Sequence, residues 1–360
     1  MKRIVVSDCE GPISKNDNAY ELAANFIPNG DTFFCNVSKY DDVLADVLRK
    51  PGYYAGSTLR LILPFLKAYG VTDQQMEDFS ADNIILIAGT RATLKHIQSI
   101  AADAYIVSTS YEHYIKALCK AVDFPYKNTY CTKVSLDKTA ITPQERDLLR
   151  ARAQEISQMP LITIPANAKS LEDFNSKDQA LIKRLDTIFW VEIPKMFVGK
   201  FLTDVVTVGG EQKAESIRDV VKRLNVSLDG VMYVGDSITD VEAFQLVREN
   251  GGLAVSFNGN SYAVKNADVA VMSENNLVTA ALADMFCRLG KAETLKAVES
   301  WGRASLETAG VAAKLFEELF VCSKGLPKVQ IVTNENMNSI VTESSEFRKK
   351  VRGVAIGRLG

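Results

Sequence analysis

Four groups of polar residues have types and spacings that could do chemistry together. They are Asp8 with Glu10, Ser108 with Thr109 and Ser110, Lys213, and Asp236 with Asp240. Each group stands at the end of an apolar run or at the beginning of a helical pattern, where a hydrophobic core gains nothing from polar side chains. Because the carboxyl ends of parallel strands meet at one crevice of an open sheet, we expect the four groups to converge.

Four clustered carboxylates repel one another unless a cation lies among them. Mg²⁺ suits such a site, because it takes oxygen ligands and keeps several water molecules. Asp8 and Asp236 could each give one oxygen, and the backbone carbonyl of Glu10 a third. Lys213 would add positive charge, and the hydroxyl and backbone N–H groups around Ser108 could hold phosphoryl oxygens. A phosphate monoester dianion would then be neutralised, which leaves Asp8 free to attack phosphorus in line.

The order of these motifs resembles that of the haloacid dehalogenase (HAD) superfamily of phosphohydrolases. It reads hydrophobic-Asp-x-acid-Gly, hydrophobic-Ser-Thr, Lys, then Gly-Asp-Ser-x-x-Asp. Each motif alone is weak, but the ordered set is specific, and it covers residues 1–16, 90–125 and 205–275. Within the superfamily, the stretch KAESIRDVVKRLNVSLDGVMYVGDSITDVEAF and a helical cap directly after the first motif are similar to phosphoserine phosphatase.

The resemblance implies that Asp8 is the nucleophile of an aspartyl-phosphate mechanism. Glu10 would protonate the leaving alcohol and then activate water. Most phosphatases of the superfamily have aspartate at the position of Glu10, although some members, such as the enolase-phosphatases, carry Asp-x-Glu-Gly. The longer side chain must fold back to reach the same oxygen, yet the two acids have similar reference pKa values. The chain could therefore still hydrolyse a phosphate ester. Glutamate in place of aspartate could alter the rate of hydrolysis or the leaving-group preference.

The same resemblance assigns the remaining motif residues and the cofactor. Ser108 and Thr109 would hold the phosphoryl group, and Lys213 would offset its charge. Asp236 would bind Mg²⁺, which is the implied cofactor, and Asp240 would orient Lys213 or a metal-bound water.

Two further residues fall where phosphoserine phosphatases contact the rest of their substrate. Asp17 in KNDNAYELA lies about where that group keeps an acid for the substrate amine. Arg60 in STLRLIL lies roughly where a carboxylate-binding arginine would be. Both residue types are more often plain surface charges, so substrate contact and surface charge are both open.

The elements that must position these residues alternate between strands and helices. Buried strands are predicted at 3–8, 104–110, 231–236, 253–257 and 269–272, with amphipathic helices between them. This alternation predicts an α/β fold with a doubly wound parallel sheet, which is the Rossmann-like arrangement of the HAD type. The expected parts are a HAD core of residues 1–16, 90–125 and 205–285, a helical cap of 17–89, an inserted and mainly helical module of 126–204, and a C-terminal helical extension of 286–360 with a short strand.

Local signals refine the two parts that the motifs do not explain. Thr142-Pro143-Gln144-Glu145 is a capping box with proline at the first helical position, so a helix should begin there. A second helix is predicted after Ser176. In the last part, VQIVT resembles a strand, and the basic FRKKVRG is expected to be a solvated charged face.

The composition excludes several classes of function. The chain has 360 residues, a net charge of −2 and no apolar run of 18 residues, so nucleic acid and membrane are unexpected partners. The N-terminus does not resemble a signal peptide. Six scattered cysteines without a CxxC pair predict a reduced, cytoplasmic protein. Two histidines, His96 and His113, are too few for a histidine-rich metal site.

We therefore expect a Mg²⁺-dependent phosphatase of a small phosphorylated metabolite, with phosphoserine-like substrates as candidates. One alternative is a HAD-fold accessory subunit, because the extensions are similar to archaeal HAD-like proteins that methanogen hydrogenase operons encode as subunits. Another is a phosphotransferase or mutase. A cysteine phosphatase at Cys9 would need arginine where Lys15 stands, and GGEQKAES lacks the P-loop pattern. If the chain forms a homodimer, residues 277–360 offer a place for the contact.

Overall fold

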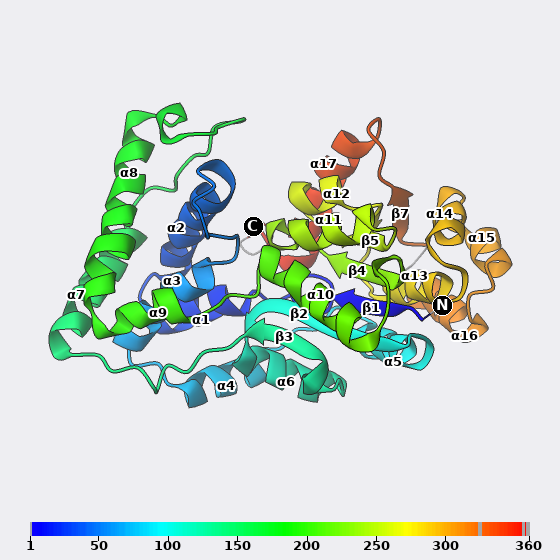
Figure 1. Cartoon of the computed structure of the whole chain (residues 1–360), viewed down its shortest axis with the longest axis horizontal. Coiled ribbons are helices and arrows are strands. Elements are labelled where there is room, and N and C mark those ends of the chain that lie inside the picture. The colour runs from blue at the N-terminus through cyan, green and yellow to red at the C-terminus, as the bar shows by residue number, and fades with distance from the viewer. Residues whose placement is uncertain (1, 323–325, 355–356, 358–360) are drawn as a thin grey trace.

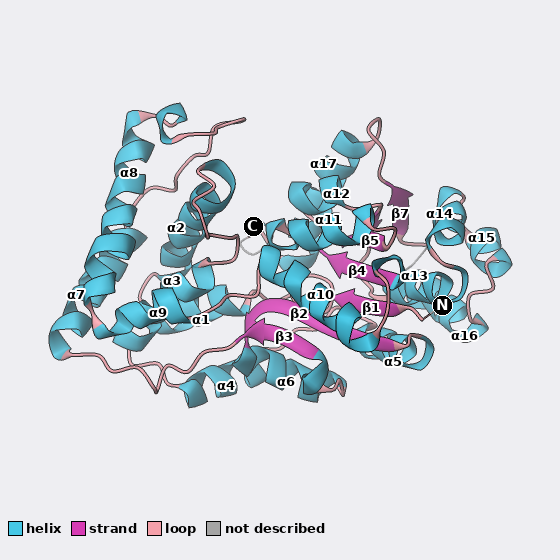
Figure 2. Cartoon of the chain, in the orientation of Figure 1, coloured by secondary structure: helices cyan, strands magenta, loops and turns pink. Residues whose placement is uncertain are grey.

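The computed structural model describes residues 2–322, 326–354 and 357. Figure 1 shows two lobes, and Figure 2 shows that the strands all lie in one of them, whereas the other consists of helices and loops. The strands are β1 (Ile4–Ser7), β2 (Asp103–Tyr111), β3 (Thr129–Thr132), β4 (Val231–Gly235), β5 (Leu253–Phe257), β6 (Val269–Met272) and β7 (Lys328–Ile331).

The helices carry labels in chain order. They are α1 (Asn18–Phe26), α2 (Gly30–Asp42), α3 (Thr58–Ala68), α4 (Asp73–Asp82), α5 (Thr90–Ile100), α6 (Glu112–Val122), α7 (Pro143–Ser157), α8 (Ser176–Thr187), α9 (Lys200–Asp204), α10 (Glu211–Leu224), α11 (Val241–Glu249), α12 (Ser261–Asn266), α13 (Leu277–Leu289), α14 (Lys291–Glu299), α15 (Arg303–Thr308), α16 (Ala313–Cys322) and α17 (Met337–Arg352).

The seven strands form one sheet in the order β3-β2-β1-β4-β5-β6-β7. Every neighbouring pair is parallel except β6 and β7, which are antiparallel. The first strand of the chain therefore lies inside the sheet, where Ser7 is in register with Ile106 and Val234. The predicted doubly wound α/β fold is confirmed, and the chain changes direction in the sheet between β1 and β4.

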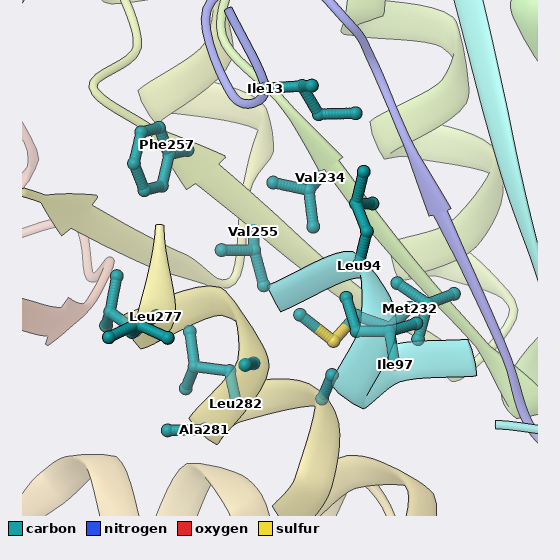
Figure 3. Packing of buried hydrophobic residues seen from close by; sticks show 14 of the residues in the cluster. Ile13, Leu94, Ile97, Met232, Val234, Val255, Phe257, Leu277, Ala281 and Leu282 are labelled. Atoms are coloured by element: carbon teal, nitrogen blue, oxygen red, sulfur yellow. The ribbon is translucent and has the colours of Figure 1, made fainter. Parts of the chain in front are cut away.

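Side chains of the strands alternate between two helical layers, as the period of a strand requires. Val5 faces a cluster formed with α5, α6 and α13, whereas Ile4 and Val6 face a cluster formed with α10 and α11. Figure 3 shows the first cluster, in which Val234 and Val255 of the sheet face the helical side chains. Strands that are buried on both faces explain why these runs are almost wholly apolar.

The helical lobe has one apolar core made from two separate stretches of the chain, residues 19–76 and 134–205. Its halves also share hydrogen bonds: the Asn36 side-chain amide donates to the Ile156 carbonyl at 2.9 Å. Within the segment 126–204, which was expected to be an inserted and mainly helical module, residues Thr129–Thr132 form β3 and pair with β2 in the sheet. Unlike β1 and β6, which also have four residues, β3 has the sequence TYCT and lacks an apolar run that would identify it.

Several local predictions are confirmed. Thr142 caps α7 with both hydrogen bonds of the capping box, and α8 begins at Ser176. VQIVT contributes β7, and α17 then packs back on α12 and β6. No helix in the described part of the chain is both long and apolar enough to cross a membrane. The cysteines with described side chains are free thiols: Cys9, Cys35, Cys119, Cys131 and Cys287.

Candidate active site

The sheet brings the predicted site residues together where the two lobes meet. Asp8 follows β1 directly, Ser108 and Thr109 lie on β2, and Asp236 follows β4. These residues line a cavity of about 100 Å³, and residues of α2 and α3, including Asp41, line its opposite wall.

Lys213 forms ion pairs with two of the carboxylates. Its ammonium lies 2.8 Å from Asp8 Oδ2 and 2.7 Å from Asp240 Oδ1, and its side chain is fully buried. Asp240 also accepts hydrogen bonds from the Tyr233 hydroxyl at 2.6 Å and from the N–H groups of Asp236 and Ser237 at 2.9 Å. Burial raises the pKa of Asp240, but Lys213 and these hydrogen bonds outweigh it and leave that pKa below its usual value.

The surroundings of Asp8 stabilise its anion less than those of Asp240 do. Its Oδ1 accepts the N–H of Cys9 at 2.6 Å, and its own N–H donates to the Val234 carbonyl at 2.8 Å. Burial raises the pKa of Asp8 to about 7, and the charges of Asp240 and Asp236 add to this, against the opposing effect of Lys213. The Lys213 ammonium alone therefore does not offset the cost of burying the Asp8 anion.

Glu10 lies in the same cavity and anchors the first helix of the cap. Its Oε1 accepts the N–H of Asn18, the first residue of α1, at 2.7 Å. Burial raises the pKa of Glu10 well above its usual value, and the neighbouring Asp17 raises it further. Both effects favour the neutral form of Glu10 over its anion. Asp17 also lines the cavity, where its Oδ1 accepts the N–H of Tyr20 at 3.0 Å and caps α1.

The hydroxyls of β2 differ in how they are bonded. Ser108 donates to the Ser110 hydroxyl at 3.1 Å and accepts the Ser110 N–H at 3.2 Å. The Thr109 hydroxyl oxygen is buried without a hydrogen-bond partner in the part of the chain that the structure describes. A buried polar atom without a partner is costly, so Thr109 is prepared for a ligand that offers or accepts a hydrogen bond.

Arg60 is the one predicted site residue that does not join the others. Its guanidinium lies over the ring of Tyr53, 5.2 Å from the centroid, and donates to the Leu202 carbonyl at 3.4 Å. It is not among the residues that line the cavity. On α3 this arginine faces the interior of the helical lobe, which its sequence neighbourhood could not reveal.

Two residues that were expected to be solvated belong to the site instead. Arg348 and Arg352 of α17 line the cavity, and both guanidinium groups contact Oδ2 of Asp236, that of Arg352 at 3.0 Å. The prediction of a solvated face for FRKKVRG is therefore wrong at these two positions. A signal was present: Arg348 follows Ile340 by eight residues and Ser344 by four, and these positions share the buried face of α17.

Gly11 allows Asp236 to approach the loop after β1. A Cβ atom at this position would lie 2.0 Å from Asp236 Oδ2, and φ is +109°. Both facts exclude any residue but glycine. Glycine is therefore needed at position 11 of the first motif because the Asp236 carboxylate of the last motif lies against it.

The donor set fits a divalent cation by type. Oxygen atoms of Asp8, Asp236 and Asp240 lie within 4.8 Å of one another, and all three residues are buried. Five carboxylates surround three cationic side chains: Asp8, Glu10, Asp17, Asp236 and Asp240 around Lys213, Arg348 and Arg352. Carboxylates therefore outnumber cationic side chains at this site, and a divalent cation would offset part of that excess. The arginine contacts nevertheless engage one oxygen of Asp236.

Comparisons with known proteins identify the family of the chain. The chain matches the family model described as haloacid dehalogenase-like hydrolase over residues 60–284, which is more than half of its length. No curated protein matches the chain.

Among solved structures, the chain is similar to the gene product AF1437 from Archaeoglobus fulgidus. It is 27% identical, with a TM-score of 0.79, and the match covers 100% of this chain and 99% of that one. A structure of phosphoserine phosphatase in apo form is 12% identical, with a TM-score of 0.42, over 76% of this chain and 96% of that one. The chain described here belongs to the haloacid dehalogenase-like hydrolases.

Proposed function

We propose that the protein is a phosphoric monoester hydrolase that uses Asp8 as its nucleophile. The observation that carries the proposal is the Asp8–Lys213–Asp240 network at the carboxyl edge of the sheet, beside a cavity that Asp8 and Thr109 both line. Such a network serves the transfer of a phosphoryl group, in which positioning and charge stabilisation do most of the work.

The reaction would proceed in two steps on this chain's own residues. A carboxylate oxygen of Asp8 attacks phosphorus, the bond from phosphorus to the alcohol oxygen breaks, and Glu10 donates its proton to that oxygen. The pKa of Glu10, which burial raises, supports its role as the proton donor. Water then attacks the phosphorus of the aspartyl-phosphate, Glu10 takes a proton from it, and phosphate leaves with Asp8 restored.

Mg²⁺ is the cofactor that we propose, with Asp8, Asp236 and the backbone carbonyl of Glu10 as its ligands. When bound, it would supply the positive charge that keeps Asp8 ionised and offsets the phosphoryl oxygens. Lys213 contributes charge on the other side of Asp8, and the hydroxyls of Ser108 and Thr109 face the same cavity.

The substrate that we propose is a small phosphorylated metabolite. The cavity of about 100 Å³ limits its size while the lobes are together. Asp17, Asp41 and Asp42 line the cavity away from the sheet, and this acidic wall supports a substrate with an ammonium group, such as phosphoserine.

The experiment is phosphate release from a panel of phosphorylated metabolites, phosphoserine included, in the presence of Mg²⁺. Wild type, Asp8→Asn and the control Asp82→Asn, an exposed residue of α4, are compared side by side. We expect release by wild type and by the control only, and its loss in EDTA. Full activity of Asp8→Asn would refute the proposal. No release from any substrate would favour the accessory-subunit or phosphotransferase alternatives.

A further inference from the structure

Helix α17 brings two buried cations to the carboxylate of Asp236. Arg348 and Arg352 are four residues apart and therefore lie on the same face of the helix. The side chain of Arg348 is 3% exposed and that of Arg352 is 5% exposed. Both donate to Asp236 Oδ2, and Arg348 also donates to the Asp236 backbone carbonyl at 3.1 Å.

The same face of α17 fixes the loops around the site. Arg352 donates through Nε to the Lys15 carbonyl at 3.1 Å and through a terminal nitrogen to the Asn16 carbonyl. One turn before Arg348, the Ser344 hydroxyl donates to the Gly259 carbonyl at 2.7 Å. The arginines are therefore held in a defined geometry and are not mobile surface charges.

Packing of α17 against the core does not require Arg348 and Arg352 to contact Asp236. Ile340 and Val351 of α17 are already buried against the core, and burial of two guanidinium groups costs solvation that apolar residues would not lose. The other flank of α17, with Glu343 and Lys350, borders a groove of about 800 Å³. The helix is thus not enclosed on all sides.

A divalent cation and the arginine pair make conflicting demands on Asp236. Mg²⁺ requires oxygen ligands at about 2.0–2.1 Å in a nearly octahedral arrangement. An oxygen that accepts bonds from two guanidinium groups has its lone pairs engaged, and the two positive charges repel a dication. Binding of the metal through this oxygen therefore requires the arginines to withdraw.

We propose that Arg348 and Arg352 compete with the divalent cation for Asp236, so that α17 restrains metal loading of the site. The proposal rests on the proposed function, because it concerns regulation of the same centre. With the arginines in place, Asp236 is neutralised by the chain itself. When the arginines withdraw, the Asp236 carboxylate is available to the metal. The larger the fraction of time that the arginines occupy this carboxylate, the lower the apparent affinity for the metal.

The test is calorimetric titration of the full chain with Mg²⁺ alone. Arg348→Gln and Arg352→Gln should each bind Mg²⁺ at least about tenfold more tightly than wild type, as expected for an occupancy of about nine-tenths. Lys350→Gln removes the same charge from the same helix, but its ammonium pairs with Glu274 at an exposed position. This control should differ from wild type by less than about twofold, because exposed charges are screened.

A second measurement uses wild type only, so it does not depend on the folding of any variant. Hydrogen exchange of the α17 amides, residues 337–352, should become faster when Mg²⁺ saturates the protein. Unchanged or slower exchange would overturn the proposal, as would glutamine variants that bind Mg²⁺ no more tightly than wild type.

The outcomes separate this proposal from the proposed function. If wild type releases phosphate with Mg²⁺ but the variants gain no affinity, only the competition fails. If Mg²⁺ binds to none of the proteins, both the metal requirement and the competition fail. If Asp8→Asn keeps full activity while the glutamine variants gain affinity, the proposed reaction fails and the competition stands.

Discussion

The burial of Asp8 leads to a prediction about stability. Replacement of Asp8 by asparagine should make the metal-free protein more stable at pH 8 while abolishing turnover. The pKa of Asp8 is about 7 in the fold against an ordinary 3.8, because burial and the charges of Asp240 and Asp236 disfavour its anion. A neutral side chain of the same shape avoids that cost.

The sign and the size follow from this pKa. A group whose pKa is raised in the folded protein makes stability fall as the pH rises, here between about pH 4 and pH 7, and the loss is complete above that range. A pKa difference of about three corresponds to about 4 kcal/mol. Asparagine also gives up the 2.8 Å ion pair with Lys213, so we expect a net gain of about 2 to 4 kcal/mol.

Urea unfolding in EDTA at pH values from 5 to 8 measures the effect. The free energy of unfolding of Asp8→Asn should exceed that of wild type most at pH 8, and the gap should narrow toward pH 5. Added Mg²⁺ should narrow the gap at pH 8, because a cation that binds the folded wild type stabilises it. The exposed control Asp82→Asn should stay within about 0.5 kcal/mol of wild type. An Asp8→Asn protein that is no more stable than wild type at pH 8 in EDTA would refute the reasoning.

Three further substitutions test the same centre. Lys213→Met leaves two buried carboxylates without their cation, so unfolding free energy at pH 7 should fall by about 3 kcal/mol or more, and a loss below about 1 kcal/mol would contradict the geometry. Gly11→Ala should lower the stability by at least about 2 kcal/mol more than Gly52→Ala, because both have positive φ but only Gly11 faces a carboxylate oxygen; equal thermal midpoints would count against this account. Tyr233→Phe removes a 2.6 Å hydrogen bond to Asp240 and should cost about 1 to 3 kcal/mol in the same urea assay, whereas an unchanged midpoint would show that the bond contributes little.

The sequence predicted the sheet and the residues at its carboxyl edge because both depend on local patterns. Apolar runs that end in Asp8, Ser108 and Asp236 identify the strands and the polar residues at their carboxyl ends, and parallel pairing makes these ends converge. Lys213 was found for the same reason, since it begins an amphipathic pattern that α10 confirms. Each of these inferences needed no knowledge of distant parts of the chain.

The rest of the site depends on contacts that local patterns do not record. Arg348 and Arg352 reach Asp236 across more than one hundred residues of sequence, within a run of four basic residues that is typical of a solvated face. Conversely, Arg60 was considered as either a substrate contact or a surface charge, and the packing of α3 turns it toward Tyr53 and Leu202. The direction of a charged side chain follows from tertiary packing, which composition cannot supply.

The divided core of the helical lobe has a consequence for how the chain folds. Residues 19–76 cannot complete that core until residues 134–205 arrive, and β2 and β3 must be placed in the sheet between the two stretches. Contacts of such long separation delay folding, because the loops between them must close first. The chain also crosses between the two lobes several times. We therefore expect one cooperative loss of structure on heating, and no contiguous fragment of the sequence should yield the helical lobe alone.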